Sequence, residues 1–502
     1  MDHDPINFRF SKFKAVMKIE KYFQFDKLQT TFKKEIIGGV STFLAMVYIL
    51  TVNPALLGSA ASINSKIAPM NIGATTISLK GVFLATTLST FLATMIMGLF
   101  ANVPVAVSTS MGLNVFFTYT LANSVSEHNE WLGYEGALIA VMISSFVFLI
   151  FSITPLRYYI IQALPKSLII IMGVSIGLFI AYIGFADMGW FKMNGGLPNS
   201  DLSRLKTNYP MILIGMLTLG IMIFLNYKKV SGAVIIAIII GFIISIIVAN
   251  VVSKDSNIIN QNTSALFNSK FDNIKDSFKH YSDMFVGFKD NMKNTFSEFG
   301  NSKIWKSPTM YVSIFIIFFL NFFDATGTLT AVTVQVNKTK NTELTIPQKA
   351  LVVDSAATVI GSALCTSPMG AFIESNTGVQ QGARSGFASL ITGLLFLLAV
   401  VVGPIFQAIP QCVTSAACIF VGMMMISEID SIEWKKPEFG ISALFSIIFM
   451  LATYNIANGV AMSIMIYVFI MIVTGKIKEI NKFMYLLCLI FLLYFIGLST
   501  IQ

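Results

Sequence analysis

Hydrophobic residues occur along this chain in long runs separated by short polar connections. A helix needs about 20 apolar residues to cross the hydrocarbon core of a bilayer, and many of the runs approach that length. Because lipid offers no hydrogen-bond partners, such runs are expected to be helical. The pattern predicts an all-α polytopic membrane protein with fourteen transmembrane segments, at 35–53, 81–101, 105–121, 136–154, 165–185, 210–226, 230–252, 308–334, 345–364, 367–382, 384–403, 410–427, 437–454 and 456–475.

Three regions lie outside this series. The apolar tail 483–500 is long enough for an extra C-terminal helix. The polar insert 253–307 could be a small folded cap or a loop outside the membrane, and a loop is our prediction. Segment 1–34 is charged and lacks the apolar core of a signal peptide. We expect a basic cytoplasmic tail there, either solvated or partly folded as an amphipathic helix on the membrane surface.

The insert divides the predicted spans into two similar halves. A proline, an apolar run, a polar break with glycine and a second apolar run follow one another from Pro210 and again from Pro437. The stretch after Pro165 likewise resembles the stretch after Pro410. Since each half has an odd number of spans, the second half must be inverted relative to the first. This 7+7 inverted repeat is typical of secondary transporters.

One interrupted segment stands at the third position of each half. "VPVAVSTSMGLNVFFTYT" begins at Val103, and "SPMGAFIESNTGVQQGARSG" begins at Ser367. Both start with small and polar residues, so we predict short extended stretches in spans 3 and 10 that lead into half-helices. Non-helical backbone at membrane depth must be surrounded by protein or by a wet cavity, and paired interruptions indicate a transporter's binding site. Free N–H groups at the two half-helix starts could donate to a polar ligand.

Two carboxylates make this region a candidate solute site. A carboxylate at the bilayer centre costs roughly 2.5–3.5 kcal/mol, which favours a functional role for Glu374. The alternative is a structural acid that is hydrogen-bonded to Ser375 or Thr377. Asp324 shares a helix face with Asn321, three residues earlier. Its alternative role is hydrogen bonding between helices.

Asp354 and the positions of the histidines bear on which residues could carry a proton inside the membrane. For Asp354 a structural role is as well supported as a direct one. The three histidines, His3, His128 and His280, lie outside the predicted spans. Any proton carrier inside the membrane must therefore be a carboxylate, and Asp324 and Glu374 could share one proton as a coupled pair.

Composition and charge agree with a membrane protein. The chain is 55% hydrophobic and only 12% charged, about half the charge of a soluble protein. Lys and Arg concentrate in the connections on one side of the predicted spans, which places the N-terminus in the cytoplasm. This asymmetry explains the net charge of +9 without a nucleic-acid partner. The cysteines lack metal-ligand spacing and are predicted to pack as small apolar residues.

Other functions fit the sequence less well. An anion transporter on the same scaffold would favour a cation or bare helix N-termini over two carboxylates. Acids on separate interrupted elements do not resemble the lining ring of a channel. An enzyme is not predicted, because the spans contain no Ser–His–Asp set, no histidine-rich metal cluster and no phosphate-binding loop.

The motifs around these residues resemble the AzgA-like purine permeases of the nucleobase–cation symporter (xanthine/uracil permease) superfamily. The resemblance is carried by "STFLAMVYILTVNPALL" from Ser41, "MGLNVFFTYT" from Met111, "FFDATGTLTAV" from Phe322, "FIESNTGVQQGARSG" from Phe372 and "YNIANGVAMSIMIYV" from Tyr454. These matches follow one another in order from residue 35 to about residue 475.

The resemblance implies a purine importer of the plasma membrane that works by alternating access. Its substrates would be hypoxanthine, guanine and adenine, and a proton, or else sodium, would be the coupling ion, with no cofactor. Transport of uracil, xanthine or an anion on the same fold is the alternative. The implied domains are a core domain at 35–154 and 308–403 and a gate domain at 155–252 and 404–475, flanked by the C-terminal region 476–502. A homodimer through the gate domain is compatible with the family.

Carried over to this chain, the substrate-binding residues are Asn114, Asp324 and Glu374, and both carboxylates are candidates for proton coupling. Asn321 stands where relatives commonly have an additional acid. The flat faces of a purine could stack on phenylalanines, for which the candidates are Phe116, Phe117, Phe322, Phe323 and Phe372. A hydrogen bond to a charged group contributes on the order of 1.5–3 kcal/mol, so two or three would suffice for micromolar affinity.

Overall fold

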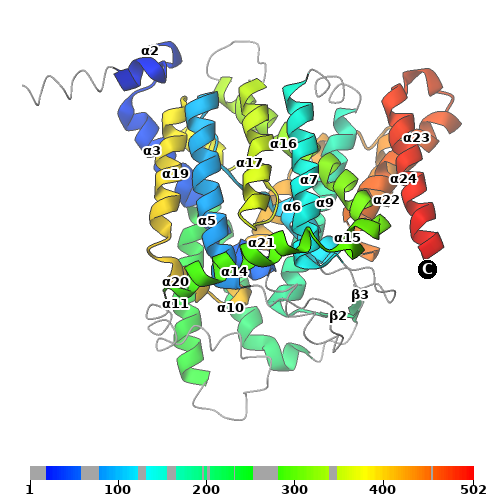
Figure 1. Ribbon diagram of the computed structural model, residues 1–502. Helices are drawn as coiled ribbons and strands as arrows, with labels where there is room; N and C mark the ends of the chain where they lie inside the picture. The colour runs from blue at the N-terminus through cyan, green and yellow to red at the C-terminus, as the bar shows by residue number, and fades with distance from the viewer. Residues whose placement is uncertain are drawn as a thin grey trace, which may run out of the picture.

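The computed structural model describes residues 18–57, 78–122, 132–154, 165–194, 197–199, 204–230, 232–252, 281–337, 348–453 and 456–501. Most of this part is helical, and the longer helices run side by side (Figure 1). Every span predicted from hydropathy overlaps a helix or a strand joined to a helix. Six of the described helical runs are long and apolar enough to cross a membrane: Phe32–Leu57, Leu79–Ala101, Gly133–Ile153, Ser167–Met188, Tyr209–Tyr227 and Gln411–Ser431.

The helices pack as two bundles. The first bundle consists of α3 (Phe32–Met46), α5 (Leu79–Ile96), α7 (Gly133–Ile153), α16 (Pro308–Asn337), α17 (Gln348–Ala363), α18 (Ser375–Gln380) and α19 (Gly386–Ala399). The second bundle consists of α9 (Lys166–Met188), α10 (Arg204–Tyr227), α11 (Ala233–Val252), α21 (Gln411–Ile426), α22 (Pro437–Ala452) and α23 (Ile456–Val473). Buried aromatic side chains from both bundles, including Phe148, Phe179, Phe322 and Phe420, belong to one continuous apolar core.

The two interrupted segments meet inside the first bundle. β1 (Val107–Thr109) pairs antiparallel with β4 (Met369–Ala371), so that Val107 lies opposite Ala371. β1 leads into α6 (Met111–Val115), which continues as the π-helix η2 (Phe116–Ala122), and β4 leads into α18. The predicted extended stretches in these two segments are therefore confirmed, and the two segments are hydrogen-bonded to each other.

Two long helices of the second bundle make a close contact. α9 and α21 form the most extensive contact between any two described helices. A Cβ added at Gly177 of α9 would lie 2.6 Å from the Cβ of Met425 and 2.9 Å from the carbonyl oxygen of Gly422. These distances are too short for any residue but glycine, so the two helices touch backbone to backbone as small residues allow in membrane bundles.

Substituting this glycine should weaken the second bundle. We expect Gly177→Ala to lower the midpoint of thermal unfolding of the purified protein, because overpacking a close contact typically costs about 1–3 kcal/mol. Gly173→Ala is the matched control on the same helix, since a Cβ there meets no atom within 4 Å. Equal unfolding midpoints for the two variants would contradict the close crossing.

Part of the polar insert forms a helix that covers the first bundle. The prediction of a loop over 253–307 is wrong where α14 (Asp283–Glu298) and α15 (Ser302–Lys306) form, whereas residues 253–280 lie outside the described part. α14 lies across the upright helices of the first bundle (Figure 1) and packs against α5. Its buried residues are Met284, Gly287, Asn291 and Thr295, a helical spacing that the polar composition of the insert obscures.

Asn291 anchors α14 at the start of α5. The backbone N–H of Ser78 donates to Asn291 Oδ1 at 3.1 Å, and Asn291 Nδ2 donates to the carbonyl oxygen of Ser78 at the same distance. Lys80 Nζ also lies 3.0 Å from Asp283 Oδ2. α14 is therefore fixed to the first bundle at several points.

Both terminal regions contact the helical body. Phe25, in the short helix α2 (Phe25–Leu28), packs edge-on against Phe387 of α19 with 6.0 Å between ring centroids. This part of the predicted tail is therefore packed rather than solvated, and residues 1–17 lie outside the described part. At the other end, α24 (Lys482–Ile501) confirms the extra helix predicted at 483–500 and stands beside α23 (Figure 1).

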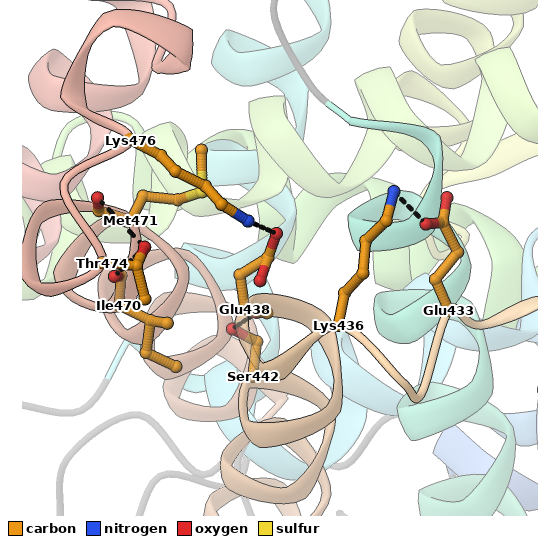
Figure 2. A network of polar contacts seen from close by, with 8 residues as sticks. All are labelled: Glu433, Lys436, Glu438, Ser442, Ile470, Met471, Thr474 and Lys476. Atoms are coloured by element: carbon orange, nitrogen blue, oxygen red, sulfur yellow. Dashed lines mark hydrogen bonds and ion pairs between the residues drawn. The ribbon is translucent and has the colours of Figure 1, made fainter.

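Polar contacts join the start of α22 to the end of α23. Lys476 Nζ lies 2.7 Å from Glu438 Oε1, and the Glu438 side chain is only 6% exposed (Figure 2). The Ser442 hydroxyl donates to the carbonyl oxygen of Glu438 at 2.6 Å. Lys436 forms a separate ion pair with Glu433 on the connection before α22. This end of the second bundle is thus closed by a network that links two consecutive helices.

Candidate functional site

The strand pair is supported by side chains of the helices around it. The Thr94 hydroxyl of α5 donates to the carbonyl oxygen of Val107 at 3.0 Å and accepts from the N–H of the same residue at 3.0 Å. Asp354 Oδ1 of α17 accepts from the N–H of Ala371 at 2.7 Å. Hydrogen bonds from neighbouring helices thus replace those that a continuous helix would supply, which meets the requirement for irregular backbone at membrane depth.

Asp354 therefore has the structural role that the sequence left open. Its carboxylate is buried and accepts from the backbone of β4. Thr358, one turn later on α17, donates to the carbonyl oxygen of Met369 in the same strand at 2.7 Å. Asp354 and Thr358 together hold β4 in place.

Asp324 lies beside the strand pair. The Ser110 hydroxyl donates to Asp324 Oδ2 at 2.7 Å. Ser110 is the N-cap residue of α6, yet its hydroxyl makes no capping hydrogen bond and is directed to the carboxylate instead. The same Oδ2 lies 3.1 Å from the position that a Cβ on Gly370 would take. A side chain at residue 370 would therefore crowd the Asp324 carboxylate.

Glu374 stands where β4 ends and α18 begins. Its Oε1 accepts from the hydroxyl of Tyr48 at 2.8 Å. The alternative partner Ser375 is engaged elsewhere, because its hydroxyl accepts from the N–H of Ala106 at 3.0 Å. Glu374 also lies close enough to Asp324 for the two carboxyl groups to interact electrostatically. The structure therefore brings together the two acids that the sequence places in separate halves.

The backbone donors of α18 are less available than predicted. The N–H groups of its first three residues, 375–377, donate to the carbonyl oxygens of residues 372–374 at 2.9–3.1 Å. These tight-turn hydrogen bonds occupy the groups that were expected to be free for a ligand. At this half-helix the candidate group for a polar contact is thus the Glu374 side chain and not the helix N-terminus.

Two buried amides lie on the neighbouring elements. Asn114 of α6 is fully buried, and neither its Oδ1 nor its Nδ2 has a hydrogen-bond partner in the described structure. Asn321 of α16 is 2% exposed, and its Nδ2 also lacks a described partner. An unpaired buried polar group costs about 1–3 kcal/mol. These amides are not hydrogen-bonded to either carboxylate, and they retain donors and acceptors that a polar solute can use.

The aromatic candidates separate into different roles. Phe372 is buried, and its N–H extends the strand pairing by donating to the carbonyl oxygen of Ala106 at 3.0 Å. Phe117 packs edge-to-face on Tyr134, and Phe322 contacts Phe148, so both take part in ordinary core packing. Phe116 belongs to the same core. The side chain of Phe323 lies outside the described part of the structure.

Sequence reasoning missed two polar partners of the carboxylates. Tyr48 occurs in the apolar run "AMVYIL", where nothing distinguishes it from a packing residue. Ser110 was visible as a polar residue in an interrupted segment, but its partner on α16 is 214 residues away. Only the tertiary structure pairs these hydroxyls with their acids.

Comparison with known proteins agrees with this architecture. The family model Xan_ur_permease, described as "Permease family", matches residues 33–459. The chain is 33% identical to the guanine/hypoxanthine permease PbuG of Bacillus subtilis, covering 96% of this chain and all of the relative. It is 27% identical to the adenine permease AdeP of Escherichia coli, covering 95% of each chain.

A solved structure shares the fold at low identity. The transmembrane domain of a cyanobacterial bicarbonate transporter, BicA, matches with a TM-score of 0.54 and 16% identity, covering 87% of this chain and 97% of that domain. This likeness concerns the fold alone. The family match and the nearly full-length alignment to PbuG confirm the resemblance seen in the sequence motifs. The chain is a multi-pass membrane protein that belongs to the Xan_ur_permease family of permeases.

Proposed function

We propose that this protein imports purine nucleobases, with hypoxanthine and guanine as the first candidates and adenine as the next. The observation that carries the proposal is the meeting of Asp324 and Glu374 at the junction of two paired strands. A purine presents N–H donors and ring-nitrogen acceptors on its edges. Carboxylates can accept the N–H groups, and the unpartnered amide of Asn114 can match a mixed edge. Relatives named as purine permeases support the same substrate class.

Transport would proceed by alternating access between the two bundles. The first bundle, with residues 35–154 and 308–403, acts as the core domain, and the second, with 155–252 and 404–475, acts as the gate domain. The chain crosses the plasma membrane fourteen times as a 7+7 inverted repeat, with its N-terminus in the cytoplasm. Pairing of equivalent segments, β1 with β4 and α9 with α21, supports the repeat. Two copies would associate through the gate domain.

The coupling ion is proposed to be a proton that is carried by the carboxylate pair. Asp324 and Glu374 are both partly buried and interact electrostatically. Like charges that are held close favour one shared proton over two ionised groups. Sodium is the alternative ion, and replacing it with choline in the uptake medium distinguishes the two.

Transport of another solute on the same fold is the second candidate. BicA, a bicarbonate transporter, shares the fold. Two carboxylates at the site disfavour an anion, because like charge at a buried site costs binding energy. Uracil, a pyrimidine, and xanthine, a dioxopurine, offer N–H groups similar to those of hypoxanthine and guanine and are the competing substrates.

Uptake measurements test the proposal directly. Radiolabelled hypoxanthine, guanine, adenine and uracil are supplied to a host that lacks its own nucleobase transporters, across a pH series. We expect accumulation of at least one purine above its external concentration, and stronger accumulation at lower pH. A protein that equilibrates solutes without accumulating them, or that accumulates only an anion, would contradict the proposal.

Asn114 should determine which purines compete. We expect Asn114→Ala to change the order in which unlabelled purines inhibit uptake, because alanine removes an amide donor and an amide acceptor that no described residue uses. The measurement is a competition profile with hypoxanthine, guanine and adenine. Asn226→Ala, at an exposed position near the end of α10, is the control. A profile unchanged from the wild type would mean that Asn114 only packs.

A further inference from the structure

We propose that Tyr48 is a positioning residue for substrate binding. Its hydroxyl orients the Glu374 carboxylate by a hydrogen bond, although Tyr48 belongs to neither interrupted segment. This inference rests on the proposed function, since it assigns the group that orients the purine-binding acid. Tyr48 lies in the helical run Phe32–Leu57, 326 residues from Glu374 in sequence. The contact therefore depends on the tertiary structure and cannot be inferred from the sequence of either interrupted segment.

One oxygen of the Glu374 carboxylate has no side-chain donor among the described residues. Tyr48 is 1% exposed, and its single hydroxyl proton is donated to Glu374 Oε1 at 2.8 Å. Among the described residues, Tyr48 is the one side chain that hydrogen-bonds to Glu374. The bond fixes the direction of the carboxyl group, and Oε2 receives no side-chain donor from the described structure. A ligand N–H can thus approach Oε2 while Oε1 remains held.

A second buried tyrosine shows what a purely structural contact looks like in this chain. Tyr134 of α7 is also buried, and its hydroxyl donates at 2.9 Å to the backbone carbonyl oxygen of Cys365. That bond satisfies the phenol without involving a site residue. Tyr48 is also buried and its bond is nearly the same length, but its acceptor is the partly exposed carboxylate of the candidate site. The acceptor, rather than the burial, separates the two roles.

Tyr48 also lies at the boundary between the two bundles. Val52, one turn after Tyr48 on the same helical run, lines a cavity of about 10 Å³ together with Cys418 of α21. A cavity of this volume has room for roughly one water molecule. The cavity is bordered by Leu56 on one side and by Gln411 and Ser415 of the second bundle on the other. Tyr48 therefore connects the binding acid to the surface along which the bundles face each other.

The test compares Tyr48→Phe with Tyr134→Phe, two substitutions that each remove one buried hydroxyl and keep the ring. Uptake of radiolabelled hypoxanthine is measured in the transporter-deficient host at equal amounts of protein in the membrane. We expect Tyr48→Phe to raise KM about tenfold or more, because the ionised carboxylate loses a charge-assisted hydrogen bond. The maximal rate should change much less. Tyr134→Phe should leave KM near the wild-type value.

A double variant with Glu374→Asp tests whether Tyr48→Phe acts through the Glu374 carboxylate. In Glu374→Asp the shortened carboxylate is drawn back from the Tyr48 hydroxyl, so adding Tyr48→Phe should raise KM little further. Equal KM values for Tyr48→Phe and Tyr134→Phe, or a full additional increase in the Glu374→Asp background, would overturn the role of Tyr48 while the proposed function stands. Failure of the wild type itself to accumulate any purine would overturn the proposed function and the role of Tyr48 with it.

Discussion

Glu374→Gln is expected to abolish purine uptake, or to weaken it by at least about 10- to 100-fold, while the protein remains in the membrane. Glutamine has nearly the shape of glutamate, and its amide oxygen can still accept from Tyr48, so the junction of β4 and α18 should be kept. What is lost is the negative charge that accepts a ligand N–H. A hydrogen bond to a charged group contributes roughly 1.5–3 kcal/mol, which corresponds to this range of affinity.

The measurement is initial uptake of radiolabelled hypoxanthine or guanine, normalised to the amount of protein in the membrane fraction. Glu374→Asp is the companion variant, because it retains the charge but shortens the side chain by one methylene group. It should keep part of the activity that glutamine loses. Uptake by Glu374→Gln at the wild-type rate and KM would remove this residue from the site.

Asp324→Asn should uncouple transport from its driving ion. Asparagine preserves the size of the side chain and can still accept from the Ser110 hydroxyl, but it cannot take up and release a proton. We expect purine to equilibrate across the membrane without rising above its external concentration. The pH dependence of accumulation should disappear as well.

Steady-state accumulation is measured between mildly acidic and mildly alkaline pH, with and without a protonophore. Ser110→Ala provides the comparison, since it removes the hydrogen bond to Asp324 and retains the carboxylate. That variant should still accumulate purine, with altered affinity. Persistence of wild-type pH dependence in Asp324→Asn would exclude Asp324 as the proton carrier.

Hydropathy was sufficient for most of the helical architecture, because a membrane-spanning helix needs a continuous apolar stretch and little else. The interrupted segments were also predictable. An ordinary lipid-facing helix does not contain clusters of glycine, proline, hydroxyl and acidic residues such as those found in these apolar regions. The antiparallel pairing of β1 with β4 was not part of the prediction, which gave only an extended stretch in each segment.

The insert was harder to predict. α14 is polar overall, and three of its four buried residues are a glycine, an asparagine and a threonine. Its stability comes from contacts with α5, such as the two hydrogen bonds between Asn291 and Ser78, and these belong to the tertiary structure. The polar composition of the insert therefore led to the loop prediction, although its buried residues recur at helical spacing.

The candidate site was predicted in part. Asp324 and Glu374 stood out because polar groups are costly in lipid, and Asp354 stood out for the same reason although it serves β4. Asn114 was identified through the resemblance to the AzgA-like permeases. The free-energy cost of burying a polar group points to the residue but not to its hydrogen-bond partner. Tyr48 and Ser110 were missed because a hydroxyl is cheap to bury once it has an acceptor, and their acceptors lie hundreds of residues away.

The pairing of β1 with β4 has a consequence for biosynthesis. Ala106, next to β1, is hydrogen-bonded to Ser375, which is translated 269 residues later. Until the ribosome has delivered that later stretch, the nascent first half holds backbone donors and acceptors without their final partners. Contacts so distant in sequence form slowly. The centre of the first bundle can therefore be completed only after the second half of the chain has been synthesised.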